Sequence, residues 1–202
     1  MEHIKQVALK EIATIAAGQT FRDKAEAVDD KNGIRLIQIK DIKEGRFSQV
    51  HTLPFANLDF ATLKVKLNSG EILLPLRGGR TEAMLFDTSD TSQTVTTINQ
   101  VAVIFPNSKL VIPEFLLWYL NSCHGKQIIN SMKTGSTIQQ LSIRAVAEIT
   151  IDVPPLSVQS KIAEIYDNWQ QQKKVLNELI INGGILAERL CLEKIAQSGV
   201  TL

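Results

Sequence analysis

The sequence of 202 residues predicts an α+β fold, with a β-rich globular domain that carries short helices and a long C-terminal helix of coiled-coil type. Two observations support this prediction. Short apolar and β-branched runs recur between residues 34 and 153, separated by turn residues and without the regular strand–helix alternation of a parallel α/β sheet. From Ser157 onward, apolar residues follow helical spacing instead. We therefore expect a globular domain at 1–155 and a helical arm at 156–202.

The globular domain is predicted to begin with a helix and to continue mainly as strands. Apolar residues recur at helical spacing in residues 7–17, and Gly18 suits the chain reversal that follows a helix. Residues 29–33 and Ser89-Asp90 have turn chemistry, as do Gly70, Gly78-Gly79 and Pro106-Asn107. The predicted strands are 34–39, 71–76, 83–86, 94–98, 101–105 and 149–153.

Two helical segments are expected among these strands. Pro113 and Glu114 are typical of a first helical turn, because proline needs no N–H there and an acid faces the positive helix end. The apolar stripe of this helix continues to Met132, with a break predicted at Gly125. Residues 142–147 are predicted to form a short turn of helix.

The helical arm follows the proline pair that ends the last strand. Ser157 is the predicted N-cap, and Gly183-Gly184, at about 1 kcal/mol per glycine, predicts a kink or an end of the first helical run. A helix over residues 157–182 would be roughly 40 Å long. Its apolar residues have coiled-coil spacing and favour pairing with another chain; folding back onto its own domain is the alternative. This seam consists of Ile162, Ile165, Trp169, Leu176, Leu179, Leu186 and Leu190.

The charge balance does not by itself indicate a nucleic-acid partner. The net charge is +1, and residues 1–155 hold 17 Lys and Arg against 16 Asp and Glu. A DNA-binding protein with this balance must place its few basic residues at the DNA, or obtain phosphate contacts from a partner protein. No apolar run is long enough to cross a bilayer, and the N-terminus lacks the apolar core of a signal peptide, so we expect a cytoplasmic protein without membrane contact.

The sequence predicts no catalytic residue, no metal site and no cofactor. An adenine methyltransferase places Asn or Asp before a proline pair and an aromatic residue after it, to hold the flipped base, whereas Pro154-Pro155 is flanked by Val153 and Leu156. A magnesium-dependent nuclease needs clustered carboxylates, and Asp41-Ile42-Lys43 offers one corner of such a site. The three histidines share no ligand spacing.

In the tail of the chain, Thr134–Leu141 is followed by an apolar strand, the proline pair and the arm helix. This tail resembles the DNA specificity (S) subunits of type I restriction–modification systems, and it is the most specific of several similar segments along most of the chain. The other similar segments are Leu9–Thr20, Ile37–Gly45, Asn68–Gly79 and Ile112–Leu120. The resemblance implies that residues 1–155 form a target recognition domain and residues 156–202 a helical spacer.

The resemblance also implies a mechanism. An S subunit carries two recognition domains on antiparallel spacer helices, and each domain reads one half of a split DNA target. Modification (methyltransferase) subunits pack on the spacers, and restriction subunits supply translocation and cleavage. This chain has one domain and one spacer, so a half-size form would pair with a second copy and read a palindromic target. A fragment or a recombination cassette is the alternative.

For DNA contacts, we expect polar residues in turns next to these segments. Arg77 and Arg80 flank Gly78 and Gly79, which allow close approach of the backbone, and arginine can bind guanine bidentately. Gln139 and Gln140 could read adenine, and the alternative for every candidate is an ordinary solvated side chain. Phosphate contacts are predicted for Lys133, Ser136 and Thr137. The second group of candidates is Gln19, Thr20, Arg22, Lys40, Lys43 and Arg46.

Two other classes of function remain open from the sequence. A non-catalytic protein-interaction module with a helical arm would bind its partners without selecting a DNA sequence. A small magnesium-dependent nuclease would cut DNA with the metal alone.

Overall fold

A computed structural model describes residues 5–27, 33–88 and 92–197. The chain divides into two compact units, Met1–Ala163 and Glu164–Leu202. The strands are β1 Lys5–Ala8, β2 Ala13–Ala17, β3 Ile34–Ile37, β4 Gly45–Phe47, β5 Glu71–Pro75, β6 Met84–Phe86, β7 Thr94–Thr97, β8 Val101–Pro106 and β9 Thr150–Val153. The helices are α1 Leu9–Ile12, α2 Pro113–Asn121, α3 Cys123–Ser131, α4 Ile143–Ala147 and α5 Leu156–Gln197. The turns predicted at Ser89-Asp90 and in most of 29–33 lie outside the described residues.

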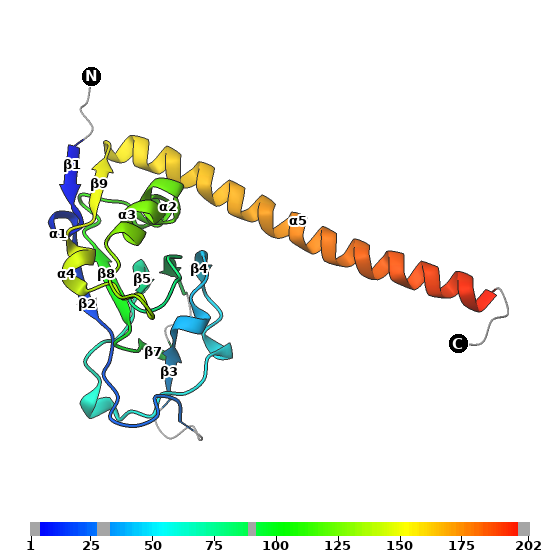
Figure 1. Cartoon of the computed structure of the whole chain (residues 1–202), viewed down its shortest axis with the longest axis horizontal. Helices are drawn as coiled ribbons and strands as arrows, with labels where there is room; N and C mark the ends of the chain where they lie inside the picture. Colours follow the sequence, from blue (N-terminus) through cyan, green and yellow to red (C-terminus); the bar gives the residue numbers. More distant parts are fainter. Residues whose placement is uncertain (1–4, 28–32, 89–91, 198–202) are drawn as a thin grey trace. The chain divides into compact units, whose positions relative to one another are not determined.

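The first unit is built on a mixed five-stranded sheet with the order β2-β8-β5-β6-β4 (Figure 1). Strand β8 pairs antiparallel with β2 and β5, β5 pairs antiparallel with β6, and β4 pairs parallel with β6. Two further ribbons are formed by β1 with β9, antiparallel, and by β3 with β7, parallel. The strands and short helices confirm the predicted α+β class, and all six predicted strands are present.

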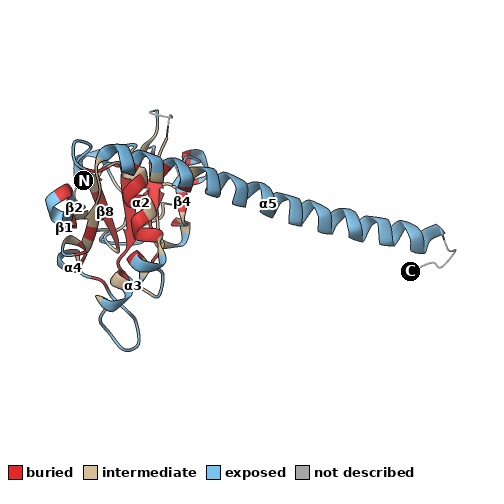
Figure 2. Ribbon diagram, turned by 90° about the horizontal axis from the view of Figure 1, so that it is seen from above, coloured by how far each residue is buried: buried red, intermediate tan, exposed pale blue. Residues whose placement is uncertain are grey.

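The core lies on the central strands and under α2. Every residue of β5 is buried, because this strand has a neighbour on each side and is covered on its faces. Helix α2 contributes Phe115, Leu116 and Leu120 to the buried interior (Figure 2). The carboxamide of Asn121 accepts from Ala83 N at 2.9 Å and donates to Ala83 O at 2.9 Å, which fastens the end of α2 to the start of β6.

The helix predicted for residues 7–17 is wrong. Only α1 is helical there, and the flanking residues form β1 and β2. The reason is tertiary: β1 pairs with the distant β9, and β2 pairs along its whole length with β8. These ladder hydrogen bonds outweigh a local helical spacing. Gly18 follows directly, and a Cβ at this position would lie 2.3 Å from Ile98 O, so the close backbone approach requires glycine.

The break between the two helices after residue 113 lies at Ser122, not at the predicted Gly125. The Ser122 hydroxyl accepts from Gly125 N at 3.0 Å and caps α3. Gly125 lies inside α3, where a Cβ would approach Tyr119 O to 2.1 Å. The predicted short helix at 142–147 is confirmed as α4, which Ser142 caps through Ala145 N at 3.0 Å.

Helix α5 starts one residue earlier than predicted, so Ser157 lies inside the helix and Pro155 precedes it. The helix also continues through Gly183 and Gly184, so it does not end at this glycine pair, which was one of the two predicted outcomes. A penalty of about 1 kcal/mol per glycine is small for a long helix, because adding a residue to an existing helix is far easier than starting one. None of the described helices is both long and apolar enough to cross a membrane.

The first turns of α5 are fastened to the first unit by Gln159, whose side chain is 1% exposed. Its Oε1 accepts from Ile112 N at 2.8 Å. Its Nε2 donates to Pro154 O at 2.8 Å and to Leu110 O at 3.2 Å. One side chain therefore joins the junction between β9 and α5 to the segment that precedes α2, and satisfies backbone groups of both.

Glu71, at the start of β5, is a buried acid with an incomplete set of hydrogen bonds. Its Oε1 accepts from Asn68 Nδ2 at 2.9 Å, whereas its buried Oε2 has no hydrogen-bond partner among the described residues. Burial raises the pKa of Glu71 above its usual value. Between the usual and the raised pKa, the folded protein keeps a proton that the unfolded chain has lost, so stability from this group falls as pH rises.

We therefore predict that Glu71→Gln removes a destabilising contribution at neutral pH. The free energy of unfolding of Glu71→Gln, relative to the unmodified protein, should increase as the pH rises above the usual pKa of a glutamate. Urea unfolding across this range measures the difference. Glu188→Gln, at an exposed position on α5, is the control and should show no such pH-dependent difference. A constant difference for Glu71→Gln would contradict the prediction.

Candidate functional site

Two candidate segments that are distant in the sequence, Leu76–Arg80 and Lys133–Leu141, lie side by side. Arg77 and Gln140 form an antiparallel bridge. Gly78 N donates to Gln139 O at 2.8 Å, and Leu141 N donates to Leu76 O at 2.8 Å. The structure therefore brings the predicted arginine turn and the predicted glutamine pair onto one surface, named here the Arg77–Gln140 surface.

The loop Thr134–Gln140 projects from this surface in a fixed conformation. Its ends are joined by Thr134 N to Gln140 O at 2.9 Å and by Gln140 N to Thr134 O at 2.7 Å. Gly135 has φ +101°, and a Cβ there would lie 2.5 Å from Ile138 O, so glycine is required. All residues from 134 to 140 are exposed, including Ser136, Thr137 and the apolar Ile138. The loop thus presents polar side chains to solvent on a backbone that is already ordered.

The side chains of Arg80 and Lys133 donate hydrogen bonds to backbone carbonyls at and next to this surface. Arg80 Nη1 donates to the carbonyls of Ile39 and Ile42, at 3.2 and 3.4 Å. Lys133 Nζ donates to Gly78 O at 3.1 Å and to Arg80 O at 2.8 Å, and loss of hydration lowers its pKa. Arg77, in contrast, is exposed and has no side-chain hydrogen bond within the described ranges. Unlike Arg80 and Lys133, Arg77 is therefore free to bind an external group.

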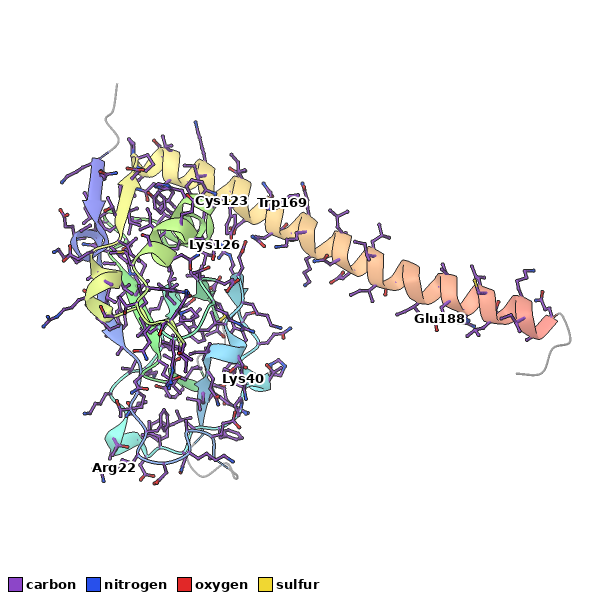
Figure 3. The ribbon with its side chains drawn as sticks, viewed as in Figure 1. Arg22, Lys40, Cys123, Lys126, Trp169 and Glu188 are labelled. Carbon is purple, nitrogen blue, oxygen red and sulfur yellow. The ribbon has the colours of Figure 1, made fainter. Side chains whose placement is uncertain are left out.

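Gln19 is not available for DNA contact. Its side chain is 4% exposed, its Nε2 donates to Thr62 O at 3.2 Å, and its Oε1 accepts from Lys64 N at 2.9 Å. The carboxamide of Gln19 thus joins its own loop to the loop at residues 62–64, a role that the sequence alone does not show. Thr20 and Arg22, both exposed, line a surface hollow of about 680 Å³. Figure 3 labels Arg22, at the bottom of the view.

The other basic candidates are mostly paired with acids. Lys40 Nζ lies 2.6 Å from Glu26 Oε1, and the hydrogen bond from Lys40 lowers the pKa of Glu26 (Figure 3). Arg46 Nη1 lies 2.9 Å from Asp87 Oδ2 and 3.3 Å from Oε1 of Glu114 on α2. Lys43 is exposed, with no ion pair to another described residue. Arg46 therefore contributes less free positive charge than the sequence suggests.

No group of three His, Cys, Asp or Glu side chains within residues 5–27, 33–88 and 92–197 is arranged to hold a metal ion. Asp41, the acid of the nuclease alternative, instead accepts from Gln38 N at 2.9 Å through its Oδ2. Its carboxylate is therefore used to cap a single turn of 3-10 helix.

The sequence matches the family of type I restriction modification DNA specificity domains over residues 1–182. The chain belongs to this family. Membership confirms the resemblance seen in the sequence. No functionally curated protein matches the chain.

Solved structures of specificity subunits share the fold. A chain from a structure of the assembly and conformational transition of the type I restriction–modification system has a TM-score of 0.69 and 18% identity, over 92% of this chain and 43% of that chain. The HsdS subunit from Thermoanaerobacter tengcongensis has a TM-score of 0.61 and 18% identity, over 86% and 39%. The S subunit from M. genitalium has a TM-score of 0.62 and 14% identity, over 93% and 44%. The present chain thus spans less than half the length of each of these three chains.

Helix α5 exposes most of the apolar seam that the sequence predicts. The exposed fractions are 70% for Ile165, 53% for Trp169 and 66% for Leu179, and Figure 3 shows Trp169 projecting from α5. Ile162 lies in the first unit and is half-buried. A second apolar row was missed in the sequence. Ile181, Ile185 and Leu192 are exposed and follow coiled-coil spacing on roughly the opposite side of the helix.

Proposed function

We propose that this chain is a non-catalytic half-size S subunit that reads one half of a split DNA target. The observation that carries the proposal is the Arg77–Gln140 surface in a member of the DNA specificity family. Arginine and carboxamide side chains carry the donors and acceptors that distinguish guanine and adenine in the major groove. The ordered loop at 134–140 supports this role, because a surface fixed in advance loses less entropy on binding.

We propose roles for the remaining candidates from their surroundings. Arg77, Gln139 and Gln140 contact base edges, while Ser136, Thr137 and Lys43 contact phosphates. Arg80 and Lys133 support the surface through the carbonyls that they bind. Thr20 and Arg22 form a separate contact at their hollow, whereas Lys40 and Arg46 are held in ion pairs with acids. Gln19 is omitted.

We further propose that two copies pair through the seam of α5. The exposed apolar seam supports this pairing, because a second copy would cover it and would supply the second half-site reader. A two-fold pair would read a palindromic, interrupted target. The second apolar row offers a contact for modification subunits, and restriction subunits would join that complex. With a net charge of +1, the chain would depend on these partners for much of the phosphate contact.

Arg77→Ala tests the sequence-reading role. Loss of a bidentate arginine–guanine contact should reduce discrimination at one base pair by about 1–3 kcal/mol. Selection from randomised duplex DNA, with the chain in complex with modification subunits, measures base preference at each position. The fold should be unaffected because the Arg77 side chain is exposed.

Arg144→Ala is the matched control, since Arg144 is also exposed but lies on α4, outside the Arg77–Gln140 surface. It should leave every base preference intact. An unchanged preference after Arg77→Ala would exclude Arg77 as a base reader. A complex that assembles but selects no sequence would identify the chain as an interaction module instead.

A further inference from the structure

A third segment, the tight turn Ile98–Val101 between β7 and β8, adjoins the Arg77–Gln140 surface. Its backbone is closed by Val101 N to Ile98 O at 3.0 Å, and Gln100 O accepts from Leu76 N at 2.8 Å. The turn is thus bonded to the same stretch of chain that carries Arg77. Between the three segments lies a hollow of about 280 Å³, lined among others by Arg77, Asn99, Gln100, Thr134 and Gln140.

The side chains that line this hollow share a particular chemistry. Asn99 is exposed and Gln100 is half-buried, and neither carboxamide has a hydrogen bond to any other described residue. Gln140 provides a third carboxamide, and Arg77 provides the only charge, with no acid in the lining. A carboxamide presents one donor and one acceptor side by side, the arrangement that pairs with N6 and N7 of adenine.

We propose that Asn99 and Gln100 are specificity-determining residues that recognise adenine in the half-site read by Arg77. This inference rests on the proposed DNA-reading function and adds two residues to its site. Neutral carboxamides favour base edges over phosphates, since phosphate contact would be served better by lysine or arginine. The backbone bond of Gln100 to Leu76 fixes the distance between the carboxamides and Arg77, so the adenine and the guanine should be close neighbours in the target.

The test uses Asn99→Asp and Gln100→Glu, which keep the shape of each side chain but replace the amide donor with an acceptor. Selection from duplexes randomised over the half-site, with the chain and its modification subunits, should show a loss of adenine preference of roughly 5- to 150-fold at one position. Preference should move toward cytosine, because carboxylates accept from cytosine N4. Thermal unfolding of each variant should match the unmodified chain, since the turn is closed by backbone bonds.

Asn130→Asp and Gln127→Glu introduce the same charge on exposed positions of α3 and should leave base preference unchanged. If the turn variants select the same sequences as the unmodified chain, the assignment of Asn99 and Gln100 is overturned while the proposed function stands. A uniform loss of affinity for all duplexes, with a smaller salt dependence, would indicate phosphate contact and also overturn it. If the unmodified chain selects no DNA sequence, the proposed DNA-reading function itself is wrong, and the assignment of Asn99 and Gln100 is wrong with it.

Discussion

Alanine at both Trp169 and Leu176 is expected to convert a dimer of this chain into monomers. The two side chains are 53% and 50% exposed on α5, so pairing would bury area that water now contacts. Each apolar side chain of this size contributes about 1.5–3 kcal/mol on full burial, and a two-fold pair loses each one twice. Analytical ultracentrifugation at micromolar concentration would report the change in mass.

Gln171→Ala with Lys174→Ala is the matched control for this experiment. Both positions are exposed on the same stretch of α5 but lie outside the seam, and alanine preserves helix propensity. This control should remain a dimer. A monomeric unmodified chain at the same concentration would contradict pairing through α5, without bearing on which residues read DNA.

Gln159→Leu is expected to lower the free energy of unfolding of the first unit by about 2–4 kcal/mol. Leucine has a similar volume but leaves the backbone groups of Leu110, Ile112 and Pro154 without their partner. Each such group costs about 1–3 kcal/mol when it stays buried, and partial access to water reduces the sum. Chemical unfolding followed by circular dichroism measures the loss.

Gln127→Leu controls for the general effect of exchanging glutamine for leucine, because Gln127 is exposed on α3. It should change stability by less than about 0.5 kcal/mol, as surface substitutions usually do. Equal stability losses for the two variants would show that the hydrogen bonds of Gln159 contribute little to stability.

Much of the fold followed from local patterns in the sequence. The buried strands β5 and β8 are nearly continuous apolar runs bounded by turn residues, and both were predicted. Strand β4 was missed because it has three residues and depends on pairing with β6. The error at β1 and β2 has the same origin, since their partners β9 and β8 lie far away in the sequence. Local spacing carries no information on such pairing.

The candidate site could be predicted by residue type but not by arrangement. Arginine and glutamine in turns pointed to base reading, yet only the fold shows that Arg77 meets Gln140. The sequence also could not separate Arg77, which is free to bind, from Arg80, which holds backbone carbonyls. Asn99 and Gln100 were overlooked because two polar residues between strands look like an ordinary turn. The sequence signal for these two residues is the carboxamide of Gln100 directly after Asn99, because a tight turn needs only one such side chain.

Under the proposed function, the backbone attachments that the Arg77–Gln140 surface makes to three stretches of the chain limit how its DNA target could change. Leu76 is bonded to Gln100 on one side and to Leu141 on the other, so three distant stretches share one backbone framework. Transplanting a single loop from a relative would move the side chains of one stretch against an unmatched framework. An exchange that preserves geometry would have to carry residues 76–142 together. For engineering new specificities, the smallest interchangeable part is therefore this whole segment.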